Sequence, residues 1–257
     1  MKEFKPIDLE SLATTTEHIN RPEVSPERQA LGREEFRKRQ DELTVDAILQ
    51  HVKAVSYRAF RVGSAALADL GDKYGFEITW GHNFKPRRIR QHQWDKLCAE
   101  NNTCTTAILD GAQYISGIVV ASHHQEIGED AHDKIYNNKA LHSCLNCRNL
   151  FRELIRVGIM SGETIIRFVD DGSLVYEDES DKEILKGVID DSEEIIELPK
   201  LKLRKETITE RDVANLPAEE MTMGEFLNLY RDDRPATAGK APPPYTLPSS
   251  RVGLGIE

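Results

Sequence analysis

Tyr114-Ile-Ser-Gly-Ile-Val-Val-Ala-Ser122 is the stretch that most constrains the fold of this 257-residue chain. It is apolar or small at nearly every position, and it has the length of a strand buried on both faces. Residues 94–110 before it are rich in helix formers, and residues 144–157 after it carry apolar side chains at helical spacing. A buried strand between two helices is typical of a layered α/β domain.

Upstream of this core, the pattern predicts a long helix and a hairpin. Apolar residues from Leu43 to Ala59 recur every three or four positions, which predicts a helix of about 25 residues beginning near Arg33. Residues 60–67 and 74–80 then read as two strands joined by a turn at Gly71.

Downstream, residues 164–169 and 173–176 predict two more strands. A last short helix is expected over residues 222–230, where Thr222 and Glu225 have the spacing of a capping box. The alternation of helices and strands indicates a three-layer α/β/α sandwich with a mixed sheet of about five strands.

The composition suggests one main domain with flanking segments. Residues 33–230 form the expected domain, and residues 1–32, which lack apolar periodicity, form an N-terminal arm. Within the domain, residues 177–197 hold ten acidic residues and two lysines, and this segment is interpreted as a solvated acidic insertion. Residues 231–257 contain five of the 11 prolines and are expected to be a disordered tail.

Charge and hydropathy argue against nonspecific nucleic-acid binding, membrane insertion and secretion. The formal net charge of −10 opposes broad nonspecific binding to nucleic acid, because that binding depends on neutralising phosphates. No run approaches the roughly 18 apolar residues of a membrane span, and residues 1–10 lack the apolar core of a signal peptide. We therefore expect a cytoplasmic protein with no membrane partner.

The cysteines carry the clearest chemical signal. Cys144-Leu-Asn-Cys147 places a C-x-x-C at the start of a predicted helix, a spacing shared by metal sites and redox dithiols. Cys98 begins another predicted helix, with Ala99 and Glu100 behind it. Three thiolates beside one carboxylate would leave the fourth position of a zinc ion to water, as catalytic zinc sites do.

These residues resemble the cytidine deaminases of the type with three cysteine ligands. Cys98-Ala-Glu100 and Cys144-Leu-Asn-Cys147-Arg148 are similar to the two zinc motifs of that family, in the same order. Tyr57-Arg-Ala-Phe60-Arg-Val-Gly-Ser-Ala-Ala-Leu67 resembles its opening strand, and Gly81-His-Asn83 lies where the family has a Gly-x-Asn that contacts ribose. The resemblance covers residues 43–230.

The resemblance implies a cytidine deaminase-like fold, a zinc cofactor and hydrolytic deamination of a cytosine nucleoside or nucleotide. It implies that Cys98, Cys144 and Cys147 bind Zn²⁺ and that Glu100 shuttles protons. Phe60 and Asn83 would line the sugar side. The family's usual arginine after Cys-Ala-Glu is Asn101 here, so Arg148 is the nearest candidate to support the sulfur ligands from outside the coordination shell. A homo-oligomer, with a tetramer favoured, is also implied, in the setting of pyrimidine salvage.

The chain departs from the family near the expected substrate. Where the family has Asn-Val-Glu, this chain has Asn83-Phe84-Lys85, and Arg87, Arg88 and Arg90 follow. These cations would suit a phosphate, which favours a mononucleotide as the small-molecule substrate; the alternative is an ordinary solvated loop. Residues 125–141 form an expected insertion, and Ser143 and Leu145 replace the usual proline and glycine.

Several alternatives remain open from the sequence. A fourth ligand from Cys104 would make the zinc structural, but six helical residues after Cys98 it would be rotated away by roughly 120°. His123, His124 and His142 are possible ligands, although satisfied or solvated histidines fit their polar surroundings better. The function could instead be that of a noncatalytic zinc-stabilised scaffold, or of a deaminase acting on single-stranded nucleic acid.

Overall fold

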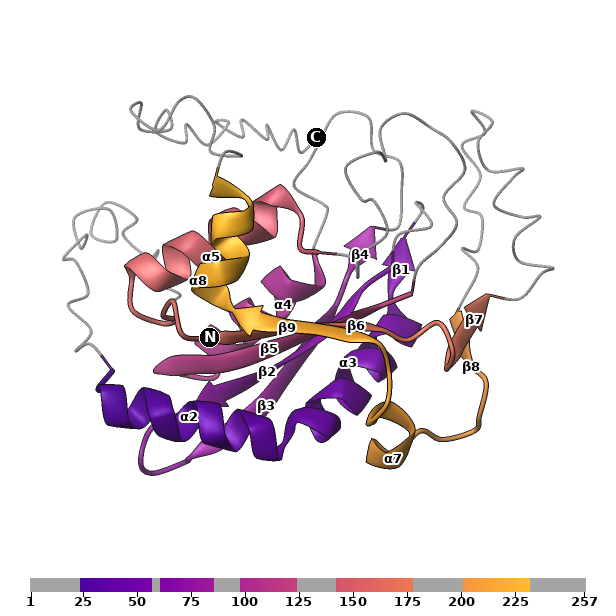
Figure 1. The fold of residues 1–257 in the computed structure, drawn as a ribbon, viewed down its shortest axis with the longest axis horizontal. Helices are drawn as coiled ribbons and strands as arrows, with labels where there is room; N and C mark the ends of the chain where they lie inside the picture. The colour runs from indigo at the N-terminus through magenta and orange to yellow at the C-terminus, as the bar shows by residue number, and fades with distance from the viewer. Residues whose placement is uncertain (1–23, 57–60, 86–97, 124–141, 178–200, 232–257) are drawn as a thin grey trace, which may run out of the picture.

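The central strand, β5 (Tyr114–Ser122), has the boundaries that its apolar run predicts, and every residue in it is buried. The computed structural model describes residues 24–56, 61–85, 98–123, 142–177 and 201–231 of the chain (Figure 1). Burial on both faces explains why β5 carries a continuous apolar run rather than alternating polar and apolar residues.

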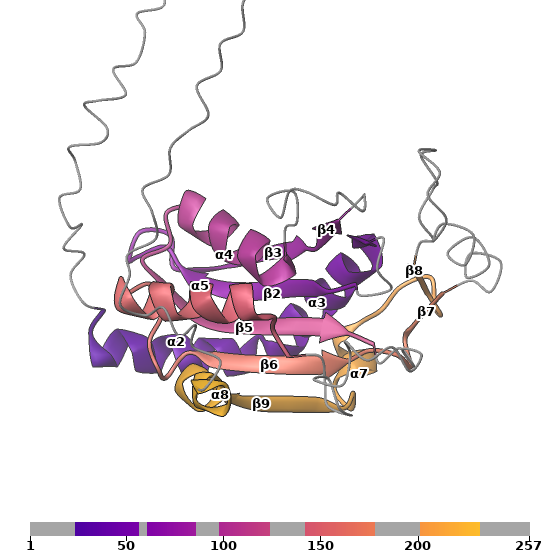
Figure 2. The ribbon, with the colours of Figure 1, turned by 90° about the horizontal axis from the view of Figure 1, so that it is seen from above.

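Five strands form one mixed sheet in the order β3-β2-β5-β6-β9 (Figure 2). β2 (Gly63–Asp69) lies antiparallel between β3 (Phe76–His82) and β5. β6 (Ile165–Asp170) is parallel to β5, and β9 (Ala218–Thr222) closes the sheet antiparallel to β6. The expected mixed sheet of about five strands is confirmed.

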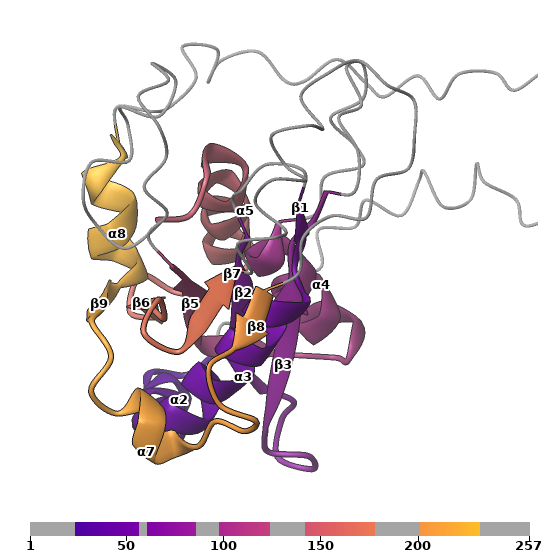
Figure 3. The ribbon, with the colours of Figure 1, turned by 90° about the vertical axis from the view of Figure 1, so that its right-hand side faces the viewer.

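Helices cover both faces of this sheet, which confirms the three-layer α/β/α sandwich (Figures 1 and 3). α4 (Ala99–Leu109), α5 (Leu145–Arg156) and α8 (Met223–Leu229) pack on one face. α2 (Pro26–Lys38) and α3 (Gln40–Lys53) pack on the other. Alternate residues of β5 point into the two layers: Ile118 and Val120 into the first, Val119 and Ala121 into the second.

The hairpin of β2 and β3 is confirmed. Gly71 and Gly75 in its turn have φ angles of 86° and 72°, in the left-handed region that side chains with a Cβ avoid. The closing helix is also confirmed, because Thr222 and Glu225 form both hydrogen bonds of a capping box at the start of α8.

The first helical segment differs from the single helix that was expected. It consists of α2 and α3, which meet at Arg39, and α2 begins at Pro26 with Ser25 as its cap. Residues 26–32, assigned to the arm from sequence, therefore belong to α2. Phe36 of α2 packs on β5 so closely that a Cβ on Gly117 would lie 2.3 Å from its ring. Apolar periodicity within one segment does not reveal such a contact.

The short elements outside the main sheet were predicted only in part. β7 (Val175–Glu177) corresponds to the strand expected over 173–176, but it pairs with β8 (Leu201–Leu203) outside the main sheet. β1 (Val55–Ser56) pairs with β4 (Phe84–Lys85), and α7 (Glu210–Val213) precedes β9. These segments are too short to show an apolar periodicity in the sequence. The strands among them can be recognised only from the strands with which they pair.

Some sequence-based assignments fall on residues that the structure does not describe. They include residues 1–23 of the arm, the acidic insertion apart from Glu177, the insertion over 125–141, and the tail beyond Arg231. The division into arm, domain and tail stays a prediction. Within the described ranges, every helix is too short or too polar to cross a bilayer.

Candidate metal centre

The structure brings together the three cysteines that the sequence singled out. The Sγ atoms of Cys98 and Cys144 are 3.5 Å apart, those of Cys144 and Cys147 are 3.6 Å apart, and all three lie within 4.8 Å of one another. Ligands about 2.3 Å from a tetrahedral zinc ion lie roughly 3.8 Å from each other. The three sulfur atoms therefore fit one ion of this size.

The topology explains how residues so far apart in sequence converge. Cys98 is the N-cap of α4, Cys144 is the N-cap of α5, and Cys147 lies in the first turn of α5. Within the part of the chain that the structure describes, neither helix start has a side-chain cap hydrogen bond. The free N–H groups and the dipole of a helix start favour negative charge, so two adjoining starts favour thiolates.

Without an ion, the thiols of Cys98 and Cys147 hold their protons tightly. Hydrogen bonding with Cys144 raises the pKa of Cys98 to about 12; Cys147 acts against this increase and burial adds to it. Hydrogen bonds with Cys144 and Cys98, followed by burial, raise the pKa of Cys147 as well. Metal binding must displace these protons, so affinity at this centre rises with pH.

Glu100 lies beside the cysteines in the first turn of α4, and it is only 4% exposed. Burial raises the pKa of its carboxyl, and the neighbouring Cys144 adds to the increase, while hydrogen bonds act in the opposite direction. Its burial next to three sulfur ligands suits a group that exchanges protons with a substrate rather than with bulk water.

Arg148 follows Cys147 in α5 and is largely buried. Its Nη1 donates to the carbonyl oxygen of Ser143 at 2.6 Å, and its guanidinium stacks 4.1 Å from the ring centroid of Tyr230. Arg148 therefore holds the backbone that leads into Cys144 and joins α5 to the end of α8. Its support of the sulfur ligands stays a prediction.

Cys104 is a packed thiol, as helix geometry predicts. It is fully buried in the core between the sheet and α4, and its Sγ is outside the group of sulfur atoms that could share an ion. Burial raises its pKa.

His142 is also a satisfied histidine. Its Nδ1 lies 2.5 Å from the hydroxyl of Tyr230, and its Nε2 lies 3.0 Å from a carboxylate oxygen of Glu219. His124 is outside the described residues. His123 lies apart from the cysteines, in a group with His51 and Asp171, and burial lowers its pKa to about 4.

Of the predicted substrate residues, only Asn83 has a described side chain. Phe60, Arg87 and Arg88 lie outside the described residues, and for Lys85 the structure gives only the backbone, in β4. Asn83 is buried, and its Oδ1 accepts the Val62 N–H at 3.0 Å. This bond ties the end of β3 to the start of β2, and contact with a sugar stays a prediction.

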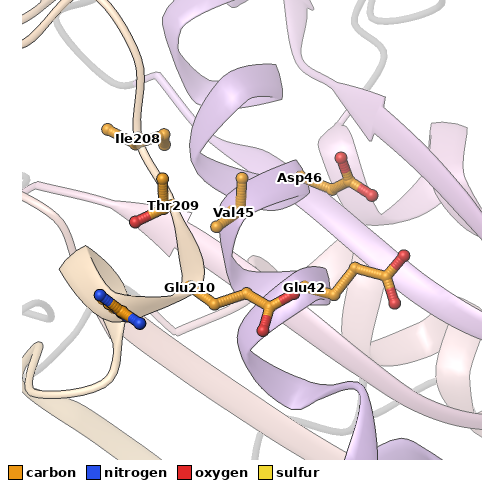
Figure 4. A pocket seen from close by; sticks show the side chains of 7 residues that line it. Glu42, Val45, Asp46, Ile208, Thr209 and Glu210 are labelled. Carbon is orange, nitrogen blue, oxygen red and sulfur yellow. The ribbon is translucent and has the colours of Figure 1, made fainter.

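A pocket of about 590 Å³ lies elsewhere, between α3 and the segment that leads into α7 (Figure 4). Glu42, Val45 and Asp46 line one side, and Ile208, Thr209 and Glu210 line the other. Burial, and then the charge of Glu42, raise the pKa of Asp46. Arg211 completes the lining beside three carboxylates. The pocket lies on the helical layer opposite the cysteines, so it is not the centre that they form.

Fold and site together define a three-layer α/β protein with a three-cysteine candidate metal centre at two adjoining helix starts. No protein-family model matches the chain, and no curated protein matches it either. Solved structures of cytidine deaminases do match. The enzyme from Burkholderia pseudomallei is 18% identical, with a TM-score of 0.37 over 51% of this chain and 84% of that chain.

Two mycobacterial structures give similar values. The cytidine deaminase from Mycobacterium leprae is 20% identical, with a TM-score of 0.34 over 49% of this chain and 85% of that chain. The one from Mycobacterium tuberculosis is 19% identical, with a TM-score of 0.33 over 49% of this chain and 82% of that chain. At TM-scores this low, the fold rests on the strand order and layers described above.

Proposed function

We propose that this protein is a zinc-dependent hydrolase that deaminates a cytosine nucleoside or nucleotide, yielding the uracil product and ammonia. The observation that carries the proposal is the convergence of Cys98, Cys144 and Cys147 around a volume that fits one ion, with the carboxyl of Glu100 buried beside them. The order and spacing of the two cysteine motifs support the same activity.

Cys98, Cys144 and Cys147 would hold zinc as thiolates, stabilised by the starts of α4 and α5. When bound, zinc supplies an activated water molecule as the nucleophile. Glu100, buried beside the cysteines, would accept the proton that water loses on adding to the ring and would pass protons to the ring nitrogen and to the amino group that leaves as ammonia. Arg148 keeps the backbone before Cys144 in place, so that the second helix start stays aligned with the first.

Ammonia release from a panel of substrates tests the activity. We expect the zinc-loaded protein to release ammonia from at least one of cytidine, deoxycytidine and CMP, and Cys144→Ser to release none above background. The competing function is a noncatalytic scaffold that uses zinc for stability alone. Zinc retention by the intact protein with no ammonia from any member of the panel would favour that scaffold.

The substrate-side proposal concerns phosphate. Lys85, Arg87, Arg88 and Arg90 put four cations close together in sequence within an acidic chain. We expect CMP to be preferred over cytidine, with the preference reduced by added salt and by Lys85→Glu, because exposed charge pairs are screened. A cytosine-bearing oligonucleotide added to the same assay tests single-stranded nucleic acid. Equal rates for CMP and cytidine, in both the intact protein and Lys85→Glu, would show that this segment does not bind phosphate and is an ordinary solvated loop.

The proposal includes a homo-oligomer, with a tetramer favoured. We expect light scattering at micromolar concentration to give a mass well above the 29.1 kDa of one chain. A mass of one chain would contradict this part of the proposal. It would not affect the proposed activity, which the ammonia assay tests separately.

A further inference from the structure

A second group of ligand-type side chains lies at the carboxyl ends of β5 and β6. His51, His123 and Asp171 each offer one nitrogen or oxygen atom, and these atoms lie within 4.8 Å of one another. His51 and Asp171 are fully buried, and the two imidazole ring centroids are 5.1 Å apart. The deaminase mechanism proposed above uses none of the three.

The fold brings these residues together on the face opposite the cysteines. His123 directly follows β5 and Asp171 directly follows β6; these strands are parallel, so their carboxyl ends adjoin. Both residues continue the alternation that places Ala121 and Val169 in the α3 layer. The backbone N–H of Asp171 donates to the carbonyl oxygen of Ser122 at 3.0 Å, which extends the strand pairing to this point.

His51 comes from the last turn of α3, which packs on the sheet at this point. This turn lies so close to β2 that a Cβ on Gly63 would be 2.1 Å from the backbone nitrogen of His51. The Nδ1 atom of His51 lies 2.7 Å from the Oδ2 atom of Asp171. A carboxylate in this position fixes the tautomer and the orientation of an imidazole, as it does for many histidines that bind metals.

The hydrogen bonding of this group is incomplete. Among the described residues, neither the Nε2 atom of His51 nor the Oδ1 atom of Asp171 has a hydrogen-bond partner, although both atoms are buried. Buried polar atoms are nearly always satisfied, and an unsatisfied one in a native protein calls for an explanation such as an ion. Two such atoms within one three-residue group point to a missing ligand.

The surrounding charges are compatible with a cation. The side chain of Arg61 is 2% exposed, and it acts on His123 together with the carboxylates of Asp171 and Asp170. Outside the group, Arg61 and Asp170 contribute one charge of each sign, and the carboxylate of Asp171 within the group adds a second negative charge. Two imidazoles and a carboxylate form a donor set suited to first-row transition metals and less suited to magnesium or calcium, which prefer oxygen ligands.

We propose that His51, His123 and Asp171 form a second metal site, for a divalent first-row transition ion such as Zn²⁺, separate from the three cysteines. The ion would join the last turn of α3 to the carboxyl ends of β5 and β6. Three protein ligands leave one coordination position for water. This inference goes beyond the proposed deamination and does not depend on it.

Metal stoichiometry of the full chain tests this site, with Zn²⁺ and Co²⁺ as probes in equilibrium dialysis. We expect two zinc ions per chain for the intact protein and one for the double variant Cys144→Ser, Cys147→Ser. Adding His123→Gln to that double variant should remove the remaining ion. In the His123→Gln single variant, Co²⁺ should still give the sulfur-to-metal absorption of the cysteine centre.

His142→Gln is the matched control, because His142 is also buried next to a carboxylate but lies outside the group. It should retain two ions. Asp171→Asn, which removes charge with little change in volume, should weaken the second site at least tenfold and gives a second readout if His123→Gln does not fold. One zinc per chain in the intact protein, lost with the cysteines and unaffected by Asp171→Asn, would overturn the proposal.

Discussion

Glu100→Gln is expected to lower the rate of ammonia release by a factor of 100 or more while the cysteine centre keeps its zinc. General acid–base groups contribute factors of about 100 to 10,000, and glutamine preserves the volume of the side chain without its ability to carry a proton. Glu100 is 4% exposed, so water cannot readily replace the lost carboxyl. Steady-state ammonia assays measure the rate, and metal analysis of the same preparation measures the zinc content.

Glu225→Gln is a suitable control for this variant. Glu225 is also a glutamate in the first turn of a helix, but its carboxylate caps α8 by accepting the Thr222 N–H at 2.9 Å. Its loss should lower the stability slightly, because one of the two capping-box hydrogen bonds is removed, and should leave the rate unchanged. A normal rate in Glu100→Gln would remove Glu100 from the mechanism, and loss of zinc in that variant would make its role structural.

Cys147→Ser is expected to remove one zinc ion per chain and to reduce ammonia release to background. The Sγ atom of Cys147 is buried and lies 3.6 Å from that of Cys144, so its loss leaves two thiolates to hold the ion. Bound zinc stabilises the folded protein by mass action, by about 4 kcal/mol at a free concentration of about 1,000 times Kd. Thermal unfolding of the intact protein with and without zinc should therefore differ more than that of Cys147→Ser.

Cys104→Ala provides the matched comparison. Cys104 is buried in the same layer but stands apart from the sulfur group, so the variant should keep the full zinc content. It should lose only the packing of one small side chain, about 1 kcal/mol. Loss of zinc in Cys104→Ala, or full zinc in Cys147→Ser, would show that the ligands have been assigned incorrectly.

The sequence alone determined the features that depend on local pattern. The apolar run of 114–122 fixed a strand buried on both faces, and the capping box at Thr222 fixed the start of the last helix. The C-x-x-C spacing placed two sulfur atoms in one helical turn, and Cys98 at a second helix start supplied the third. Each signal lies within a few residues, where the chain geometry is nearly fixed by the backbone.

The tertiary structure alone decided the features that depend on distant partners. β9 is a strand because it pairs with β6, and the helix break at Arg39 accompanies the packing of Phe36 on β5. His51 and Asp171 are 120 residues apart, yet they meet because parallel strands end together beneath the last turn of α3. Contacts of this kind follow from strand order and layer packing, and no local pattern along the chain encodes which strands become neighbours.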